Sequence, residues 1–149
     1  MIEVRATQVI PLPLEQVWEL LGDTSRYPEW VEGTAEVTRT DGPAREGSTY
    51  HEVNPILGPW KAHTSWLVTE FSPPRRQVHL STDIPLTSSF EVIMEVDPEG
   101  TGEAALVTLT LAGTPSLGPV GAAFGRLMKS SVARDNRRSL ENLASVAAC

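Results

Sequence analysis

Side chains that could move protons are few in this sequence, and the three histidines are the first to consider. His51, His63 and His79 all fall in segments that carry the alternating pattern of β-strands. Sorting the strand faces by their apolar residues predicts that His63 and His79 lie on the solvated outer face of a sheet. The strand around His51 does not alternate clearly, so the direction of that side chain stays open.

Metal and cofactor binding find no support in the pattern. No helical His-x-x-x-His pair occurs, and the single cysteine, Cys149, can form neither a cysteine cluster nor an intramolecular disulfide. Gly118, Gly121 and Gly125 do not make a phosphate loop, because no strand leads directly into them and no lysine follows as in a Walker motif. We expect these glycines to let a helix lie close to a sheet, and we predict no metal and no cofactor.

The remaining candidates for catalysis are polar residues that could point into an apolar interior. Tyr50 and Glu52 belong to one predicted strand, and Ser131 and Asp135 belong to the predicted final helix. Burial would raise the pKa of either carboxyl group, which is how proteins prepare a general acid or base. No catalytic role is assigned to any of the four.

Asp135 has a second interpretation. It could form an exposed ion pair with Arg134 or Arg138 at the edge of the helix, an arrangement that contributes little free energy. The phase of the helix also leaves open whether Asp135 or Asn136 points inward.

The elements that must position these residues are mostly strands. Alternation of apolar and polar residues predicts one strand at the start of the chain, ending before Pro11, and six more at residues 36–39, 48–53, 60–71, 77–82, 88–96 and 105–112. Turn residues separate the six later strands, so we expect each to pair antiparallel with its neighbour in sequence. No helical pattern lies between them, which excludes a parallel crossover fold.

Helical spacing of apolar residues occurs after the first strand and at the end of the chain. Residues 14–22 and a brief segment with Tyr27 and Trp30 predict two short helices, and residues 119–148 predict one long helix without internal proline. The sequence therefore predicts an α+β fold of the helix-grip type. In this fold a curved antiparallel sheet of about seven strands wraps a long C-terminal helix, with two short helices after the first strand.

Length and composition limit the class of protein. With 149 residues, 40% of them hydrophobic, the chain suits a single domain spanning residues 1–149. It contains no apolar stretch that could span a bilayer and no pattern of a secretory signal at its start, so we expect a cytoplasmic protein without stable membrane insertion. The net charge of −7 argues against nucleic acid as a partner. The oligomeric state stays open.

Alternation also predicts which side chains face the helix. Two indoles share one face of a single strand, and two thioethers come from a strand and from the final helix, materials suited to an adaptable apolar pocket. The alternative is that these residues only fill a core. The predicted ligand-binding residues are Trp60, Thr64, Trp66, Phe90, Val92, Met94, Leu109, Phe124, Leu127, Met128 and Ser131.

Several segments of the chain carry a family resemblance: residues 13–21, Asp23, residues 26–31, 47–50, 68–76 and 139–143. In this order, and over nearly the whole chain, they resemble the START-like superfamily, also called SRPBCC, which includes polyketide cyclase/dehydrase-like and Bet v 1-like proteins. The resemblance implies a helix-grip domain with an internal cavity that opens near the short helices and the strand loops.

The resemblance does not choose among the activities of that superfamily, so three functions stay open. The first is binding of a small hydrophobic or amphipathic molecule, lipid-like or aromatic. The second is a polyketide cyclase or dehydratase in which Glu52, Tyr50, Ser131 and Asp135 move protons. The third is a protein-interaction module with a collapsed cavity.

Overall fold

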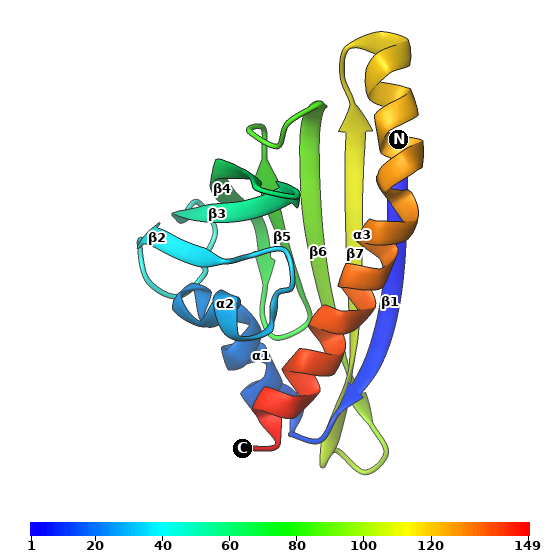
Figure 1. Ribbon diagram of the computed structural model, residues 1–149. Coiled ribbons are helices and arrows are strands. Elements are labelled where there is room, and N and C mark those ends of the chain that lie inside the picture. Colours follow the sequence, from blue (N-terminus) through cyan, green and yellow to red (C-terminus); the bar gives the residue numbers. More distant parts are fainter.

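The computed structural model describes residues 1–149 and contains one sheet and three α-helices (Figure 1). The strands are β1 (Ile2–Ile10), β2 (Glu36–Thr40), β3 (Thr49–Leu57), β4 (Trp60–Ser72), β5 (Arg76–Ser81), β6 (Thr87–Glu99) and β7 (Ala104–Pro115). The helices are α1 (Leu14–Gly22), a short 3-10 turn η1 (Thr24–Arg26), α2 (Tyr27–Trp30) and α3 (Gly118–Ala147). The predicted α+β helix-grip fold is confirmed.

The seven strands form one antiparallel sheet in the order β1-β7-β6-β5-β4-β3-β2. The six later strands are a meander, as the turns between them predict, and β1 pairs with β7 at one edge. Three strands are at least three residues longer than their predicted spans. β3 continues past Pro55, where its pairing with β4 is irregular, and β6 and β7 extend together as a long hairpin.

The two short helices are amphipathic and pack their apolar sides on the sheet. In α1, Val17 and Leu21 are fully buried, and in α2 the buried residues are Tyr27 and Trp30. The hydroxyl of Tyr27 donates a hydrogen bond of 2.7 Å to the carbonyl oxygen of Leu21, which ties α2 to α1. These helices close one end of the space beneath the curved sheet.

The long helix α3 runs diagonally across β1 and β7 and reaches α2 near its C-terminal end (Figure 1). Its close approach to β1 depends on Gly125, where a Cβ atom would lie 3.1 Å from Ile2. In its second half, Leu140 and Leu143 enter the core with the residues of α1 and α2. The inner face of the middle strands therefore lies away from the first half of α3, and a cavity remains between them. None of the helices is long and apolar enough to cross a membrane.

Candidate functional site

A cavity of about 260 Å³ lies between the inner face of the sheet and α3. This volume is just below the ~300 to 1,000 Å³ of most small-molecule sites, which suits a small ligand or one that protrudes from the opening. The walls come from β1, from α2 and the loop after it, from β3, β4, β6 and β7, from the connection between β5 and β6, and from α3.

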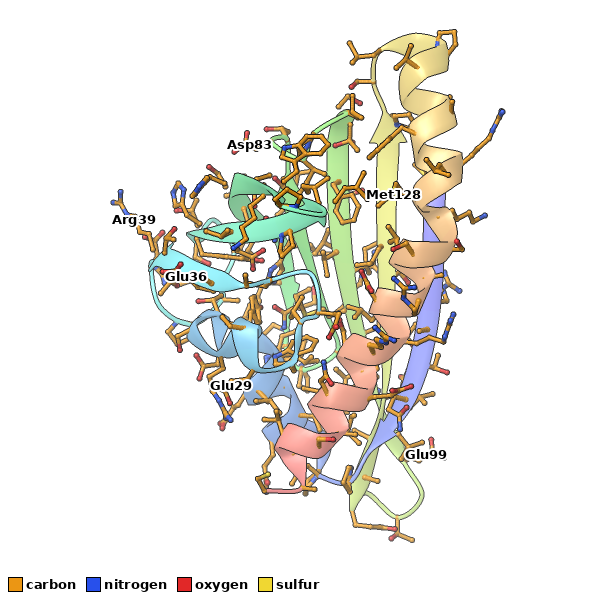
Figure 2. All side chains as sticks on the ribbon, viewed as in Figure 1. Glu29, Glu36, Arg39, Asp83, Glu99 and Met128 are labelled. Carbon is orange, nitrogen blue, oxygen red and sulfur yellow. The ribbon has the colours of Figure 1, made fainter.

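The cavity has an open apolar end and a closed polar end. Lining residues of the β5–β6 connection, such as Leu86, and of the first half of α3, such as Phe124 and Met128, are partly exposed. Figure 2 shows Met128 on α3, on the side that faces the sheet. Toward α2 the lining residues are buried and more polar; they include Tyr50, Glu52, Asn54, Asn136 and Ser139. An amphipathic molecule would fit this gradient with its polar group at the buried end.

Glu52 is the only acidic residue in the buried set, and it lies at the polar end of the cavity. Its Oε1 accepts a hydrogen bond of 2.9 Å from the Asn54 amide, which also donates to the carbonyl oxygen of Gly33 at 2.8 Å. Burial raises the pKa of Glu52 from 4.5 to about 7, against the opposing effect of hydrogen bonds from Asn54 and Thr34. Glu52 can therefore bind or release a proton near neutral pH.

Residues of β4, the strand that pairs with β3, hold the Asn54 amide in turn. The Thr64 hydroxyl donates to the Asn54 Oδ1 atom, and the Trp66 indole N–H donates to the Thr64 oxygen at 2.8 Å. Because the Trp66 ring itself lines the cavity, this chain of hydrogen bonds connects an aromatic wall to the Glu52 carboxyl group.

A second buried hydrogen-bond chain begins at Tyr50. Its hydroxyl lies 2.5 Å from the Nδ1 atom of His79, and the Nε2 atom of His79 lies 2.7 Å from the Oε1 atom of Gln77. Because Gln77 offers an oxygen, Nε2 carries the proton and Nδ1 accepts from Tyr50. Burial lowers the pKa of His79 to about 4 and raises that of Tyr50 well above 10, so both are neutral at pH 7.

The prediction that His79 lies on the outer face is wrong, because this side chain is fully buried. In β5 the polar residues Gln77, His79 and Ser81 point inward, which reverses the sorting by hydrophobicity. The pairing of the strands explains the reversal, since His79 lies opposite both Val68 and Val92, which are inward-facing residues of β4 and β6. His63 is exposed as predicted, and His51 is half-buried with its Nδ1 atom 3.3 Å from the Ser65 hydroxyl.

On α3, Ser131, Asp135 and Asn136 all line the cavity. Asn136 is the buried one, and its amide nitrogen donates to the carbonyl oxygen of Leu109 at 2.9 Å, while its Oδ1 atom has no partner. Asp135 is half-buried, lies 3.8 Å from the Arg134 guanidinium, and has a pKa raised by desolvation. Whether Asp135 or Asn136 points inward was left open by the sequence. Both line the cavity, and Asn136 is the more deeply buried of the two.

Most of the residues that the sequence predicts for ligand binding lie on the cavity wall. These are Trp66, Phe90, Val92, Met94, Leu109, Phe124, Met128 and Ser131. Their ligand-binding role stays a prediction, but their convergence on one space follows from alternation along β4, β6 and β7 and from helical spacing along α3.

Three of the predicted residues lie off the wall. Trp60 begins β4 opposite Leu57 at the tip of the β3–β4 hairpin and is 43% exposed, because the tip lies beyond the cavity wall. Thr64 is buried behind the wall, where it bonds Asn54. Leu127 is 74% exposed, since at about 100° per residue it falls beyond the stripe formed by Phe124 and Met128.

Sequence reasoning missed part of the wall. Tyr27 and Trp30 are not among the predicted ligand-binding residues, yet both line the cavity, as do Asn54 and residues 84–87 at the connection between β5 and β6. Of these residues, only Asn54 could have been predicted from strand alternation, because it lies on the same face of β3 as Tyr50 and Glu52. No group of histidine, cysteine or carboxylate side chains is arranged to hold a metal ion.

A curved antiparallel sheet, a long covering helix and an apolar cavity with a buried polar end define a helix-grip protein. The chain matches, over residues 1–148, the family described as polyketide cyclase / dehydrase and lipid transport, and it belongs to that family.

Other proteins are similar to this chain over nearly its whole length. An uncharacterized protein of Mycobacterium tuberculosis is 25% identical over 143 residues, which cover 95% of this chain and 98% of the relative. The Zhui aromatase/cyclase from Streptomyces sp. R1128 has a similar fold, with a TM-score of 0.81 at 15% identity over 98% of this chain and 93% of that one. A Thermus thermophilus protein, TTHA0849, gives 0.76 at 23% identity over 98% and 97%.

Proposed function

We propose that this protein binds a small amphipathic molecule, with its apolar part between the sheet and the first half of α3 and its polar group beside Glu52. The observation that carries the proposal is the gradient inside the cavity, from Phe124 and Met128 at the open end to Glu52 and Asn136 at the closed end. Family membership supports this function, since lipid transport is part of the family description. A collapsed interaction module has less support, because the space is open.

The polar end also defines what the ligand should offer. Below about pH 7 the Glu52 carboxyl group is neutral and can both donate and accept, and above that pH it only accepts. Tyr50 donates its own proton to His79, so its oxygen is left to accept. A hydroxyl, phenol or amine suits these acceptors better than a carboxylate or phosphate, which would place a second negative charge beside Glu52 in a poorly solvated space.

The test is a cavity-filling substitution with a matched control on the other side of the sheet. Val92→Phe adds a ring inside the cavity, whereas Val9→Phe adds the same ring on the exposed face of β1. Native mass spectrometry of the purified proteins and tryptophan fluorescence titrations with fatty alcohols, alkylphenols and polycyclic phenols would report binding. We expect wild type and Val9→Phe to bind alike and Val92→Phe to lose at least about tenfold in affinity. Equal binding by Val92→Phe, or no binding by wild type, would contradict the proposal.

A second candidate is a cyclase or dehydratase, and the state of Glu52 favours it. A carboxyl group with a pKa of about 7 inside an apolar cavity suits general acid–base work near neutral pH, and the Tyr50 oxygen lies in the same wall. Incubation with a thioester poly-β-ketone analogue should then give cyclised or dehydrated products with wild type and at least about a hundredfold less with Glu52→Gln. Unchanged products from Glu52→Gln and Tyr50→Phe would exclude this candidate while leaving ligand binding intact.

We also propose that the protein acts in the cytoplasm. The reason is its single cysteine, which is exposed and unpaired and therefore suits a reducing compartment.

A further inference from the structure

Large apolar side chains are exposed around the open end of the cavity, and the cavity itself does not use them. Leu57 follows the lining residue Ile56 at the tip of the β3–β4 hairpin, and Trp60 lies opposite Leu57. Leu117 lies in the turn before α3, and Val120 and Leu127 lie on α3 beside the lining residue Phe124. These five residues, called the rim below, are each 43–74% exposed.

Helix geometry places the α3 members of the rim on one flank. Val120 and Leu127 are seven residues apart and therefore share a face, about 40 to 60° from Phe124. The opposite edge of the cavity-facing side carries Gly125, which packs on Ile2 of β1. The rim of α3 consequently lies on its unpacked flank.

The turn before α3 contains a strained backbone conformation, and no burial of its leucine side chain compensates for that strain. Leu117 has a φ of +61° and is 67% exposed, and Leu86 in the neighbouring β5–β6 connection has a φ of +64°. A leucine in the left-handed region costs free energy that glycine or asparagine would avoid. The two turns are joined by a hydrogen bond of 3.0 Å from the Ser116 amide to the Leu86 carbonyl oxygen. A strained, exposed leucine at the opening suggests a role outside the fold.

Charge is also distributed unevenly around the opening. Although the net charge is −7, no acidic residue occurs between Glu103 and Asp135, a stretch that carries Arg126, Lys129 and Arg134. The tip of the β3–β4 hairpin, residues 53–63, carries Lys61 and no acidic residue. Asp83 is the one carboxylate in the β5–β6 connection, and it accepts a hydrogen bond from the Ser65 amide at 2.9 Å. Figure 2 shows Glu29 and Glu99 at the other end of the molecule.

We infer that the rim and its flanking cations form a docking surface for an anionic lipid bilayer, placed so that the cavity opens toward the membrane. Separate protruding leucine, valine and indole side chains can enter the boundary between headgroups and acyl chains, while Lys61 and Arg126 meet anionic headgroups. The acidic body at the far end would face away from the negative surface. A flat protein partner would be served less well, because these side chains stand on three separate segments.

The experiment measures vesicle binding by flotation and by tryptophan fluorescence. Wild type should float with vesicles of phosphatidylcholine and phosphatidylglycerol at low salt, bind vesicles of phosphatidylcholine alone at least about tenfold more weakly, and lose binding at high salt. Trp60→Ser combined with Leu127→Ser should reduce binding at least about tenfold, whereas Val9→Ser combined with Leu67→Ser, on exposed positions of the sheet's outer face, should not.

Charge reversal provides an independent arm. Lys61→Glu with Arg126→Glu should abolish the preference for anionic vesicles, while Arg39→Glu, whose side chain points away from the body on β2, should keep it (Figure 2). The cavity-filling Val92→Phe should still dock, which separates this surface from the ligand proposal. Failure of wild type to bind anionic vesicles would overturn the inference. The inference would also be overturned if the rim variants bound vesicles like wild type and differed from it only in self-association, measured by sedimentation, or in binding to an acidic protein.

Discussion

The hydroxyl of Tyr50 and the Nδ1 atom of His79 lie 2.5 Å apart inside the sheet, where neither side chain is more than 3% exposed. Aromatic rings of Tyr27 and Trp66 surround this pair, with centroids 5.5 and 6.2 Å from the Tyr50 ring. Because Gln77 accepts from Nε2, the tautomer of His79 is set and the Tyr50 proton has one direction in which to point. The pair therefore fixes the orientation of a hydroxyl oxygen on the cavity wall.

The coupling between these two residues is open to measurement. Tyr50→Phe leaves Nδ1 of His79 buried without a donor, which should cost about 1–3 kcal/mol of unfolding free energy. Because His79→Leu removes the same hydrogen bond, a double-mutant cycle in urea should show that the two losses do not add. Additive losses within experimental error would mean that the bond contributes nothing to stability.

Acid should destabilise the protein through His79. Its pKa is about 4 in the folded state and 6.5 ordinarily, so between these values the unfolded chain binds the proton more strongly. Stability from this residue is present above pH 6.5 and lost toward pH 4, by roughly 3 kcal/mol. The titration of Glu52 changes stability with pH in the opposite direction, so it is removed first by Glu52→Gln. Urea unfolding then compares Glu52→Gln with the double variant Glu52→Gln/His79→Gln. The first should lose more stability on acidification, and parallel curves would contradict the assignment.

The fold was predictable because its signals are long and regular. Thirteen-residue β4 alternates cleanly from Ala62 to Val68, and α3 continues for thirty residues without an internal proline. The walls contributed by β4, β6 and β7 followed from the same alternation.

The rest of the site could not be predicted because it depends on how elements meet. His79 points inward since Val68 and Val92 fix the register of β5, a relationship between strands that hydrophobicity within β5 contradicts. Trp60 lies at the first residue of β4, and Leu127 lies next to the cavity-facing stripe of α3 but outside it. Strand alternation and helical spacing therefore predict both residues at the cavity wall, whereas both are exposed. The pKa of Glu52 depends on its burial and on a hydrogen bond from Thr34, which lies in the loop after α2 and is distant in sequence.

The start of α3 should be intolerant of any side chain at Gly121. A Cβ atom there would lie 1.5 Å from the carbonyl oxygen of Ser116, so the turn that carries Leu117 must move. Gly121→Ala should lower the unfolding free energy by about 2 kcal/mol or more, although alanine favours helix. Gly33→Ala is the matched control, since nothing lies within 4 Å of its new methyl group. Equal stability of the two variants by thermal and urea unfolding would show that the turn relaxes freely.

Glu52 should make the protein less stable as the pH rises. The folded state holds this proton with a pKa of about 7, whereas the unfolded chain releases it near 4.5, so unfolding is favoured as the pH rises between these values. Wild type should therefore lose about 3 kcal/mol relative to Glu52→Gln between pH 4.5 and pH 8, as urea unfolding would measure. Glu36→Gln, on the edge strand β2, controls for the loss of one exposed carboxylate. A pH-independent difference between wild type and Glu52→Gln would mean that Glu52 stays ionised in the cavity, and the polar end would then select a cationic rather than a neutral ligand group.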